Sequence, residues 1–367
     1  MTRDLGSLGT ELAALCGQVA SRVQLMEVCG THTVSFFRSG LRAMLPPNLR
    51  LVSGPGCPVC VTAQRHIDAA IEIATRPGVL LATYGDMLRV PGRLGSLELL
   101  RAGGAQVRVV HSTRTAVELA RANPTQTVVF LGVGFETTAP ATAAAVLEAE
   151  RDGVNNFCVV MCHKLVVPAM TALLDAGDVP LDGFLAPGHV SVILGADAYR
   201  PVAEVYGKPV VVAGFEPEQM LKGLVGLVRQ AVEQRAAVEN VYTGIVTAGG
   251  NRVAQELLGK VCVVADTPWR ALGVIPRSGL ELSPHHERFD ALRRFDVRLG
   301  QDEDHPACRC GDVISGRVEP AECPAFATAC TPLRPIGPCM VSSEGTCSAW
   351  YKYQRPAQRS AATGGLR

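Results

Sequence analysis

Residues 127–150 read TVVFLGVGFETTAPATAAAVLEAE, and this stretch decides the fold class. Its first part, Thr127–Val133, is apolar on both faces and rich in β-branched residues, as is typical of a strand buried on both sides. A polar loop, Gly134–Thr138, separates it from Ala141–Glu150, whose apolar spacing predicts a helix. A buried strand followed by a loop and a helix is the unit from which parallel α/β sheets are built.

The same unit recurs along the chain in both directions. The string Gly134-Phe135-Glu136 is nearly repeated as Gly214-Phe215-Glu216, each after an apolar run and before a helical pattern. This near-repeat indicates two similar α/β units. The other predicted strands are Val79–Tyr84, Val107–His111, Phe157–Cys162, Phe184–Ala186 and Val210–Ala213, and the other predicted helices are Ile67–Thr75, Thr115–Arg121 and Met220–Arg235.

The pattern changes near Leu282. The helical sequence His286–Leu299 gives way to a segment rich in Pro, Gly and Cys with little periodicity, which metal ligation would hold in place of an apolar core. We therefore expect an α/β protein with two similar parallel-sheet units, residues 53–140 and 141–281. A third, cysteine-rich domain is expected to combine the N-terminal helices of residues 1–52 with residues 282–367.

Charge and hydropathy exclude several function classes. The 367 residues carry 35 Lys and Arg against 34 Asp and Glu, and no basic tract stands out, so neither nucleic acid nor a membrane surface is the expected partner. The first 20 residues include Asp4 and Glu11 and lack the apolar run of a secretory signal. The longest weakly charged run, Thr127–Leu147, is interrupted by Gly, Glu and Pro. We expect a cytoplasmic protein.

Cysteine is unevenly distributed. Six of the 13 cysteines fall between residues 308 and 347, and in a reducing compartment such a cluster favours a metal or redox site. Four thiolates converging from loops suit an iron–sulfur cluster or a structural zinc, although the short ligand spacing of zinc fingers is absent. The four candidate ligands are Cys308, Cys323, Cys330 and Cys347, and either Cys310 or Cys339 can replace one of them.

A further cysteine precedes a helical pattern near the N-terminus. The string Cys29-Gly30-Thr31-His32-Thr33 is followed by apolar residues at helical spacing from Val34 to Leu45. A cysteine at a helix N-terminus is expected to favour the thiolate, and His32 is expected to move a proton or donate a hydrogen bond to a ligand. The alternative is an ordinary helix cap with a half-buried cysteine and a solvated histidine.

The loop Gly54-Pro55-Gly56-Cys57-Pro58-Val59-Cys60 holds two cysteines separated by two residues at a helix start. This spacing is typical of a dithiol/disulfide couple. Half of a zinc site is the alternative, but the chain has no second pair with this spacing.

Two more polar loops follow predicted strands, and loops at the carboxyl ends of parallel strands hold ligands. Glu136 lies in the first loop and His189 in the second, within Pro187-Gly188-His189-Val190-Ser191. A helix-capping carboxylate and an ordinary loop histidine are the alternatives. Gly132 and Gly134 resemble the start of a dinucleotide fingerprint, but Thr137 stands where its third glycine belongs.

Together these motifs resemble the HypD family of hydrogenase maturation factors closely and over nearly the whole chain. One departure is Ala63, where the family pattern has proline. The matching strings are Met26–Thr33, Gly54–Cys60, Gly134–Thr138, Pro187–Ser191, Cys308–Asp312, Cys323, Cys330 and Gly337–Cys347.

The resemblance implies a cytoplasmic scaffold on which the Fe(CN)2CO group of [NiFe] hydrogenases is built. A HypC-type chaperone supplies one cysteine and Cys29 another, so that they hold iron while a HypE-type partner donates cyanide and carbon monoxide is added. It also implies that the cysteine-rich domain binds a [4Fe-4S] cluster through Cys308, Cys323, Cys330 and Cys347.

The residues then suggest a redox role in cyanide transfer. The cluster passes single electrons, Cys57 and Cys60 store two, His32 assists at Cys29, and Glu344 tunes the cluster or relays protons. This account requires Cys29 to lie within reach of a partner and near the couple. The alternatives are a cluster-dependent thiol–disulfide reductase of protein substrates and a zinc-stabilised interaction module.

Overall fold

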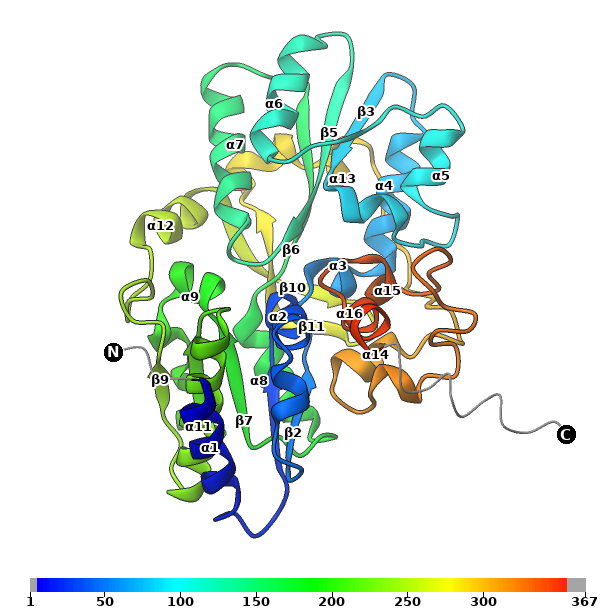
Figure 1. Ribbon diagram of the computed structural model, residues 1–367. Helices are drawn as coiled ribbons and strands as arrows, with labels where there is room; N and C mark the ends of the chain where they lie inside the picture. Colours follow the sequence, from blue (N-terminus) through cyan, green and yellow to red (C-terminus); the bar gives the residue numbers. More distant parts are fainter. Residues whose placement is uncertain (1–4, 355–367) are drawn as a thin grey trace, which may run out of the picture.

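The computed structural model describes residues 5–354 and contains two parallel sheets, stacked end to end in Figure 1, and one antiparallel hairpin. The α/β class and the two parallel-sheet units are therefore confirmed. Within the described range, no helix combines the length and apolar composition that a membrane span requires. Residues 355–367, which we assigned to the third domain, lie outside the described part of the chain.

The lower sheet in Figure 1 has five strands in the order β2-β1-β7-β8-β9, and all its neighbours are parallel. Leucines of β1 and β7 pack against the apolar stripes of helices α1 and α11, which cover one face. The strands are β1 (Val23–Glu27), β2 (Leu49–Ser53), β7 (Gly183–Pro187), β8 (Val210–Ala213) and β9 (Val238–Asn240). The associated helices are α1 (Leu5–Cys16), α2 (Gly30–Arg38), α8 (Val166–Ala176), α9 (Gly188–Leu194), α10 (Arg200–Glu204) and α11 (Pro217–Val232).

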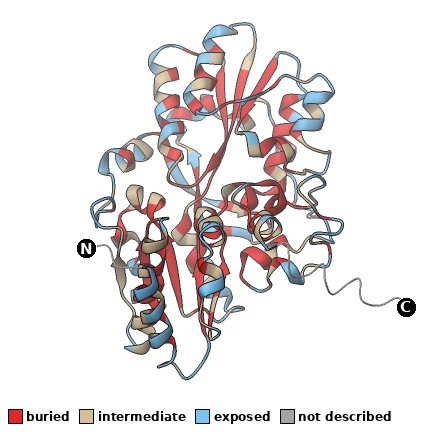
Figure 2. Cartoon of the chain, in the orientation of Figure 1, coloured by how far each residue is buried: buried red, intermediate tan, exposed pale blue. Residues whose placement is uncertain are grey.

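The upper sheet has four parallel strands in the order β4-β3-β5-β6. Its central strand β5 is buried on both faces, because α6 and α7 cover one side and α4 the other, and Figure 2 shows these strands as buried. The strands are β3 (Val79–Thr83), β4 (Val107–Val109), β5 (Thr127–Gly134) and β6 (Phe157–His163), and the helices are α3 (Pro58–Val61), α4 (Gln64–Ala74), α5 (Leu97–Ala102), α6 (Thr113–Ala122) and α7 (Ala139–Arg151).

An antiparallel hairpin, β10 (Cys262–Trp269) and β11 (Gly273–Leu282), follows helix α12 (Arg252–Val261) and packs beside the upper sheet. Trp269 is fully buried, and its indole Nε1–H donates to Ser278 Oγ at 2.7 Å. Backbone bridges join Trp269 to Thr62 and Gly279 to Lys164. The hairpin therefore braces the chain where it enters and leaves the upper sheet.

The cysteine-rich segment has only short helices: α14 (Cys310–Ile314), α15 (Pro338–Val341) and α16 (Thr346–Tyr353). As expected, it packs on the N-terminal region, because the Trp350 and Phe37 rings lie 5.8 Å apart and the Arg42 guanidinium lies 4.8 Å from the Trp350 ring. It also contacts the upper unit through the short 3-10 helix Gly85–Arg89, where Arg89 donates to Pro332 O at 3.0 Å.

The predicted strands and helices within 67–151 and 157–235 are all present, but the sheets do not follow the expected ranges. Strand β6, expected in the unit 141–281, pairs with β5 in the upper sheet. In residues 1–52 we expected only helices, but this region also forms β1 and nearly all of β2, which belong to the lower sheet. The reason is pairing over long sequence distances: β1 inserts between β2 and β7, so the upper unit is an insertion within the lower one.

Two local predictions also differ from the structure. The helical stripe from Val34 to Leu45 is broken because Gly40 adopts φ of +73°, so α2 ends at Arg38 and Met44 is 54 % exposed. The helical pattern of His286–Leu299 forms only the 3-10 helix Pro284–Phe289 and the one-turn helix α13 (Ala291–Arg294).

Candidate functional site

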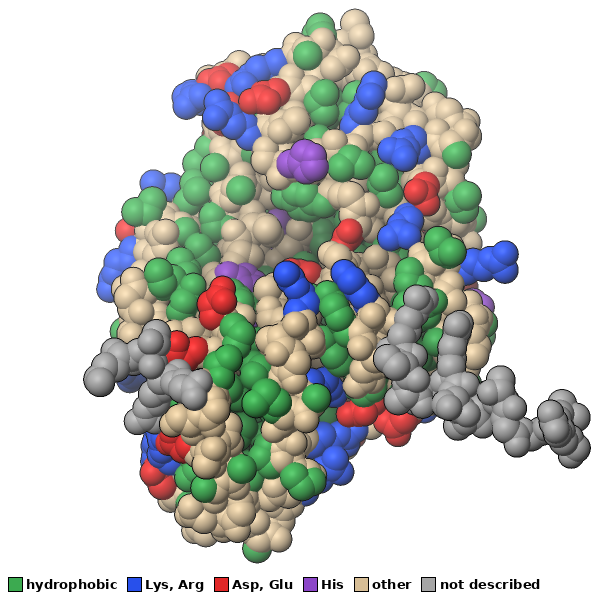
Figure 3. All heavy atoms as spheres, viewed as in Figure 1, with side chains coloured by type: hydrophobic (Ala, Val, Ile, Leu, Met, Phe, Trp, Pro, Cys, Tyr) green, Lys and Arg blue, Asp and Glu red, His purple; other side chains and the backbone are tan. Residues whose placement is uncertain are grey.

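Both parallel sheets end at one cleft of about 400 Å³. Most of its walls come from the segments after β1, β2, β3, β5, β7 and β8, that is, from the carboxyl ends of strands in both sheets, where α/β proteins bind ligands. In Figure 3 this face is hollowed between the upper and lower parts, and charges of both signs are scattered around it. The lining residues include Thr31, Gly56, Phe135, His189, Phe215 and Glu344.

Cys29 lies behind the wall of this cleft, where β1 passes into α2, and it contacts the lining residues His189 and Gly56. It is the N-cap residue of the helix, as predicted, and its amide N–H donates to Glu27 Oε2 at 3.0 Å. Its Sγ atom lies 3.9 Å from Nδ1 of the cleft-lining His189. Thiol and imidazole thus lie together at the junction of two loops that follow neighbouring strands, β1 and β7.

The electrostatic environment of Cys29 differs from the expectation. Cys29 is only 2 % exposed, and this burial raises the pKa of its thiol. The backbone hydrogen bond from His32 lowers the pKa, but burial has the larger effect. The helix N-terminus therefore does not make this cysteine a thiolate by itself. Loss of the thiol proton requires a binding partner that favours the thiolate, such as a metal cation.

His32 has a different position from the one its sequence suggests. Its ring is fully buried, so it is neither solvated nor part of the cleft lining. Its Nε2 lies 3.0 Å from the carbonyl oxygen of Gly214, which belongs to the loop after β8. Its ring packs 4.9 Å from that of Phe215. Burial lowers the pKa of His32 to about 4, so the ring is neutral near pH 7. Its side chain fixes the Phe215 loop, and His189 is the histidine beside the Cys29 sulfur.

Cys57 and Cys60 form a disulfide at the start of α3, as the two-residue spacing predicts. Both are buried, whereas the intervening Pro58 and Val59 line the cleft. The preceding Gly56 packs against Cys29, since a Cβ on Gly56 would overlap the Cys29 amide and Gly30 N–H donates to Gly56 O at 3.2 Å. The disulfide loop and Cys29 are therefore immediate neighbours.

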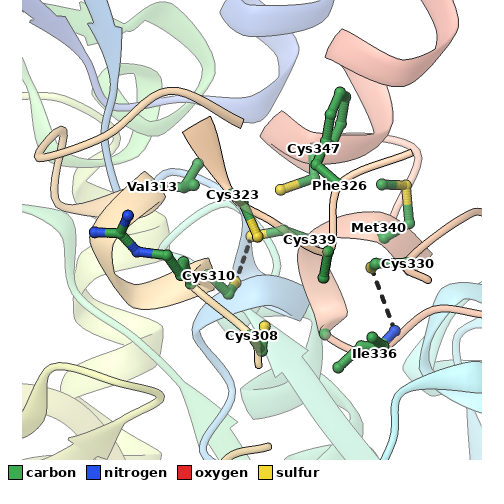
Figure 4. A pocket seen from close by; sticks show the side chains of 13 residues that line it. Cys308, Cys310, Val313, Cys323, Phe326, Cys330, Ile336, Cys339, Met340 and Cys347 are labelled. Atoms are coloured by element: carbon green, nitrogen blue, oxygen red, sulfur yellow. Dashed lines mark hydrogen bonds between the residues drawn. The ribbon is translucent and has the colours of Figure 1, made fainter. Parts of the chain in front are cut away.

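A second cluster of sulfur atoms lies in the cysteine-rich segment. All six of its cysteines line one apolar cavity of about 20 Å³ (Figure 4). Cys310 Sγ and Cys339 Sγ lie 2.7 Å apart, and Ile336 N–H donates to Cys330 Sγ at 3.4 Å. Cys310 also contacts Cys308, and Cys339 also contacts Cys347, so this close pair lies in the middle of the group of thiols and forms a potential dithiol couple. Cys308, Cys323, Cys330 and Cys347 remain as four thiols from separate loops and helix starts.

These four thiols have the donor chemistry that a [4Fe-4S] cluster requires. Iron–sulfur clusters bind four cysteine thiolates, and backbone N–H groups directed at sulfur together with an apolar lining stabilise them. Here the lining includes Phe326 and Met340, and Ile336 supplies an N–H. The donor set therefore fits the group, with Cys310 and Cys339 left over.

Glu344 links the cysteine-rich segment to the cleft. Its carboxylate lines the cleft and its Oε1 accepts a hydrogen bond from Thr31 Oγ1 at 2.8 Å. A Cβ on Gly30 would lie 2.7 Å from Glu344 Cβ, so the two backbones are in close contact. Asp86 fixes the preceding turn, since its Oδ2 accepts from Ser342 Oγ at 3.0 Å and Ser343 N–H at 3.1 Å.

The disulfide and the sulfur-lined cavity are adjacent in the fold. Helix α15, which carries Cys339, packs on α3, which carries Cys60. Cys57, Cys60, Cys310 and Cys339 all belong to the same hydrophobic core. The cavity and the disulfide thus contribute cysteines to two helices that contact each other, which the spacing of the cysteines in the sequence did not reveal.

The two polar loops have separate roles. The buried carboxylate of Glu136 caps a helix, as in the alternative interpretation, but the helix is α8, because Oε1 accepts from Val166 N–H at 2.9 Å. Burial raises the pKa of Glu136 to about 7. His189, by contrast, lines the cleft, and burial lowers its pKa to about 4. The near-repeat of Gly-Phe-Glu at residues 134–136 and 214–216 has a structural counterpart, since Phe135 and Phe215 line the same cleft from opposite sheets.

Comparison with known proteins identifies the family. A family model named HypD, described as "Hydrogenase formation hypA family", matches residues 6–354. The hydrogenase maturation factor HypD of Escherichia coli K12 is 46 % identical over 334 residues, covering 91 % of this chain and 90 % of its own. That of Azotobacter vinelandii is 46 % identical and covers 96 % of each chain. HypD2 of Bradyrhizobium diazoefficiens is 45 % identical, covering 90 % of each. The chain belongs to the HypD family.

Proposed function

We propose that this protein is a hydrogenase maturation factor that holds iron in the cleft between its two sheets while the Fe(CN)2CO group is assembled. Membership of the HypD family supports the role in hydrogenase maturation. The observation that carries the finer proposal is the meeting of Cys29, His189 and the Cys57–Cys60 loop at one cleft.

The cleft suits iron as a substrate. Cys29 supplies a soft sulfur donor and His189 a neutral imidazole 3.9 Å away, and soft donors match iron that carries strong-field diatomic ligands. His189 lines the cleft and Cys29 lies beside it, so further ligands must come from the open side of the cleft. A HypC-type chaperone that inserts a cysteine there meets this need, and a HypE-type partner is the proposed cyanide donor.

The Cys57–Cys60 couple can supply the electrons for cyanide transfer. A partner's thiocyanate, R–S–C≡N, and the dithiol react to give R–SH, hydrogen cyanide and the disulfide, so the S–C bond breaks as the S–S bond forms. Two electrons and two protons leave the dithiol. Gly56 holds this couple against Cys29, so cyanide is released beside the proposed iron site.

A [4Fe-4S] cluster held by Cys308, Cys323, Cys330 and Cys347 would supply single electrons to regenerate the dithiol. Cys339 belongs to α15, which packs on α3, so we assign the Cys310–Cys339 pair as an intermediate couple. Glu344, which contacts Thr31 rather than the sulfur atoms, is assigned to closing the cleft against the cysteine-rich segment.

The buried disulfide favours this scaffold over a reductase of protein substrates. Cys57 is 4 % exposed and Cys60 fully buried, so a protein disulfide cannot approach either sulfur without displacing Pro58 and Val59. A substrate that fits a cleft of about 400 Å³ has the size of a small group or a short peptide tip.

Iron analysis and infrared spectroscopy on the anaerobically purified complex with a HypC-type partner test the proposal. Wild type is expected to show cyanide and carbonyl bands, together with iron beyond that of the cluster. Cys29→Ser, which keeps the shape but removes the sulfur, is expected to lose the bands and that iron while keeping the cluster absorption. Cys262→Ala is the matched control, because this thiol lies in neither site. Unchanged bands in Cys29→Ser would refute the assignment, and a colourless protein with stoichiometric zinc would support the zinc module.

A further inference from the structure

A third group of potential metal ligands lies away from the cleft and the sulfur-lined cavity. Glu150 lies near the end of α7, and His285 and His286 lie in the 3-10 helix that follows β11. One ligand atom from each of the three residues lies within 4.8 Å of the others. These atoms come from segments far apart in the sequence that meet at the edge of the upper unit, and no step of the proposed function uses them.

His286 provides the observation that points to a cation. Its residue is buried, and its Nδ1 lies 3.0 Å from Ser283 Oγ, so a proton on Nδ1 can be donated to that hydroxyl. The other nitrogen, Nε2, is buried without a hydrogen-bond partner and lies 3.4 Å from Glu150 Oε2. With the proton on Nδ1, a nitrogen lone pair faces a carboxylate oxygen across this gap. A positive charge between them removes the repulsion and satisfies both atoms.

The spacing of these atoms fits a metal ion. Two ligands at 2.0–2.1 Å from zinc in tetrahedral geometry are separated by about 3.3 Å, which is close to the 3.4 Å between His286 Nε2 and Glu150 Oε2. His285 Nε2 lies 3.9 Å from Glu150 Oε1. The His285 side chain is 78 % exposed and can rotate inward to close the remaining distance.

We propose that Glu150, His285 and His286 bind a divalent transition-metal ion, Zn²⁺ in particular, with water completing the coordination. Two imidazoles and one carboxylate favour Zn²⁺, Co²⁺ or Ni²⁺ over Mg²⁺ and Ca²⁺, which prefer all-oxygen sites. Ser283 fixes the tautomer of His286, the usual task of a residue behind a metal ligand. Arg288 donates to Glu150 Oε1 at 3.0 Å and is the nearest competing cation.

The position of the site indicates what the ion does. Ser283 N–H donates to Val261 O, so the turn that holds both histidines closes the β10–β11 hairpin, and Glu150 belongs to a helix that covers the upper sheet. A bound ion ties the hairpin to that helix. Because one ligand is exposed and one coordination position is left to water, the site is of the open, exchangeable kind rather than a closed structural one.

Equilibrium dialysis of tag-free, anaerobically purified holoprotein against Co²⁺ tests this site separately from the thiols. The wild type is expected to bind one Co²⁺ with a ligand-field band and without the charge-transfer band of sulfur ligation. His285→Ala changes an exposed side chain and leaves the fold intact, and it is expected to weaken this binding at least about tenfold. Glu150→Gln is expected to do the same, and zinc is expected to displace the cobalt.

His111→Ala is the matched control, because His111 is an exposed histidine away from the three ligands. It is expected to bind Co²⁺ as the wild type does. Equal stoichiometry and affinity in the wild type, His285→Ala and Glu150→Gln would overturn the proposal, as would cobalt bound only with the sulfur charge-transfer band. Neither result bears on the iron site at Cys29.

Discussion

The contact between Gly30 and Glu344 gives the sharpest test of how the cysteine-rich segment closes over the cleft. In Gly30→Ala the new Cβ would lie 2.7 Å from Glu344 Cβ and closer still to the Glu344 carbonyl oxygen. Side-chain carbons do not approach backbone so closely, so the segment must move outward. We expect the hydrogen bond from Thr31 Oγ1 to Glu344 to lengthen or break as a result.

The magnitude follows from two contributions. Overpacking a tight contact costs about 1–3 kcal/mol, and a lost hydrogen bond to a carboxylate costs about 1.5–3 kcal/mol. When the hydrogen bond breaks, the segment can move outward, and this movement relieves part of the overpacking. The two costs therefore do not add in full, and we expect the free energy of unfolding to fall by about 2–4 kcal/mol in total. The displaced segment carries the six clustered cysteines, so iron of the proposed cluster is also expected to pass faster to a chelator.

Urea denaturation and the rate of iron transfer to a chelator measure these two effects. The matched control is Gly259→Ala on α12, where a new Cβ would meet nothing within 4 Å. There a helical glycine is replaced without a clash, so stability is expected to rise by about 0.5–1 kcal/mol and iron transfer to stay unchanged. If Gly30→Ala is as stable as Gly259→Ala and releases iron at the same rate, the reasoning about this contact is wrong.

Three further predictions concern other parts of the molecule. Trp269→Ala removes a fully buried indole and its hydrogen bond to Ser278, so the free energy of unfolding in urea is expected to fall by about 3–5 kcal/mol; a fall below about 1 kcal/mol would contradict the bracing role of the hairpin. Burial raises the pKa of Glu136 from 4.5 in the unfolded chain to about 7 in the folded protein, so the folded state holds this proton more tightly. The stabilisation is fully present below pH 4.5 and is lost as the pH rises through 7, which lowers the free energy of unfolding by at most about 3 kcal/mol. Glu136→Gln is therefore expected to be more stable relative to wild type at pH 8 than at pH 5 in urea, and a constant difference would count against it. Asp86→Ala removes the carboxylate that accepts from Ser342 and Ser343, so the free energy of unfolding in urea is expected to fall by about 1.5–3 kcal/mol and chelator assays to show faster iron release from the proposed cluster; an unchanged rate would show that this turn is held by other contacts.

Much of the fold follows from local sequence, and the exceptions have physical reasons. Thr127–Val133 is identifiable as a strand because it is apolar on both faces, and the same holds for the other strands predicted. Strand β1 was missed because Gln24 and Glu27 interrupt its apolar run. Their side chains find partners only in the folded protein, since Gln24 Oε1 accepts from Arg50 on the neighbouring strand β2 at 3.2 Å and Glu27 Oε2 accepts from the Cys29 amide at 3.0 Å.

The site was predictable in its residues but not in its arrangement. Cys29 at a helix start and the Cys57–Cys60 couple were evident from spacing, and the structure places them together. That His189, rather than His32, lies beside the Cys29 sulfur depends on which strands are neighbours, because β1 pairs with β7 only in the folded sheet. Burial of the Cys29 thiol likewise depends on the packing of several loops, which no local pattern records.

The insertion of the upper unit within the lower one has a mechanical consequence. The Gly54–Cys60 loop leaves β2 of one sheet and enters the helices of the other, so it is one of the covalent links across the cleft. Any rotation of one sheet against the other must twist this link, and a bond between its two sulfurs stiffens it. If the proposed couple is reduced, that stiffening bond is lost, so the proposed redox role would tie the ease of opening the cleft to the oxidation state of the loop beside it.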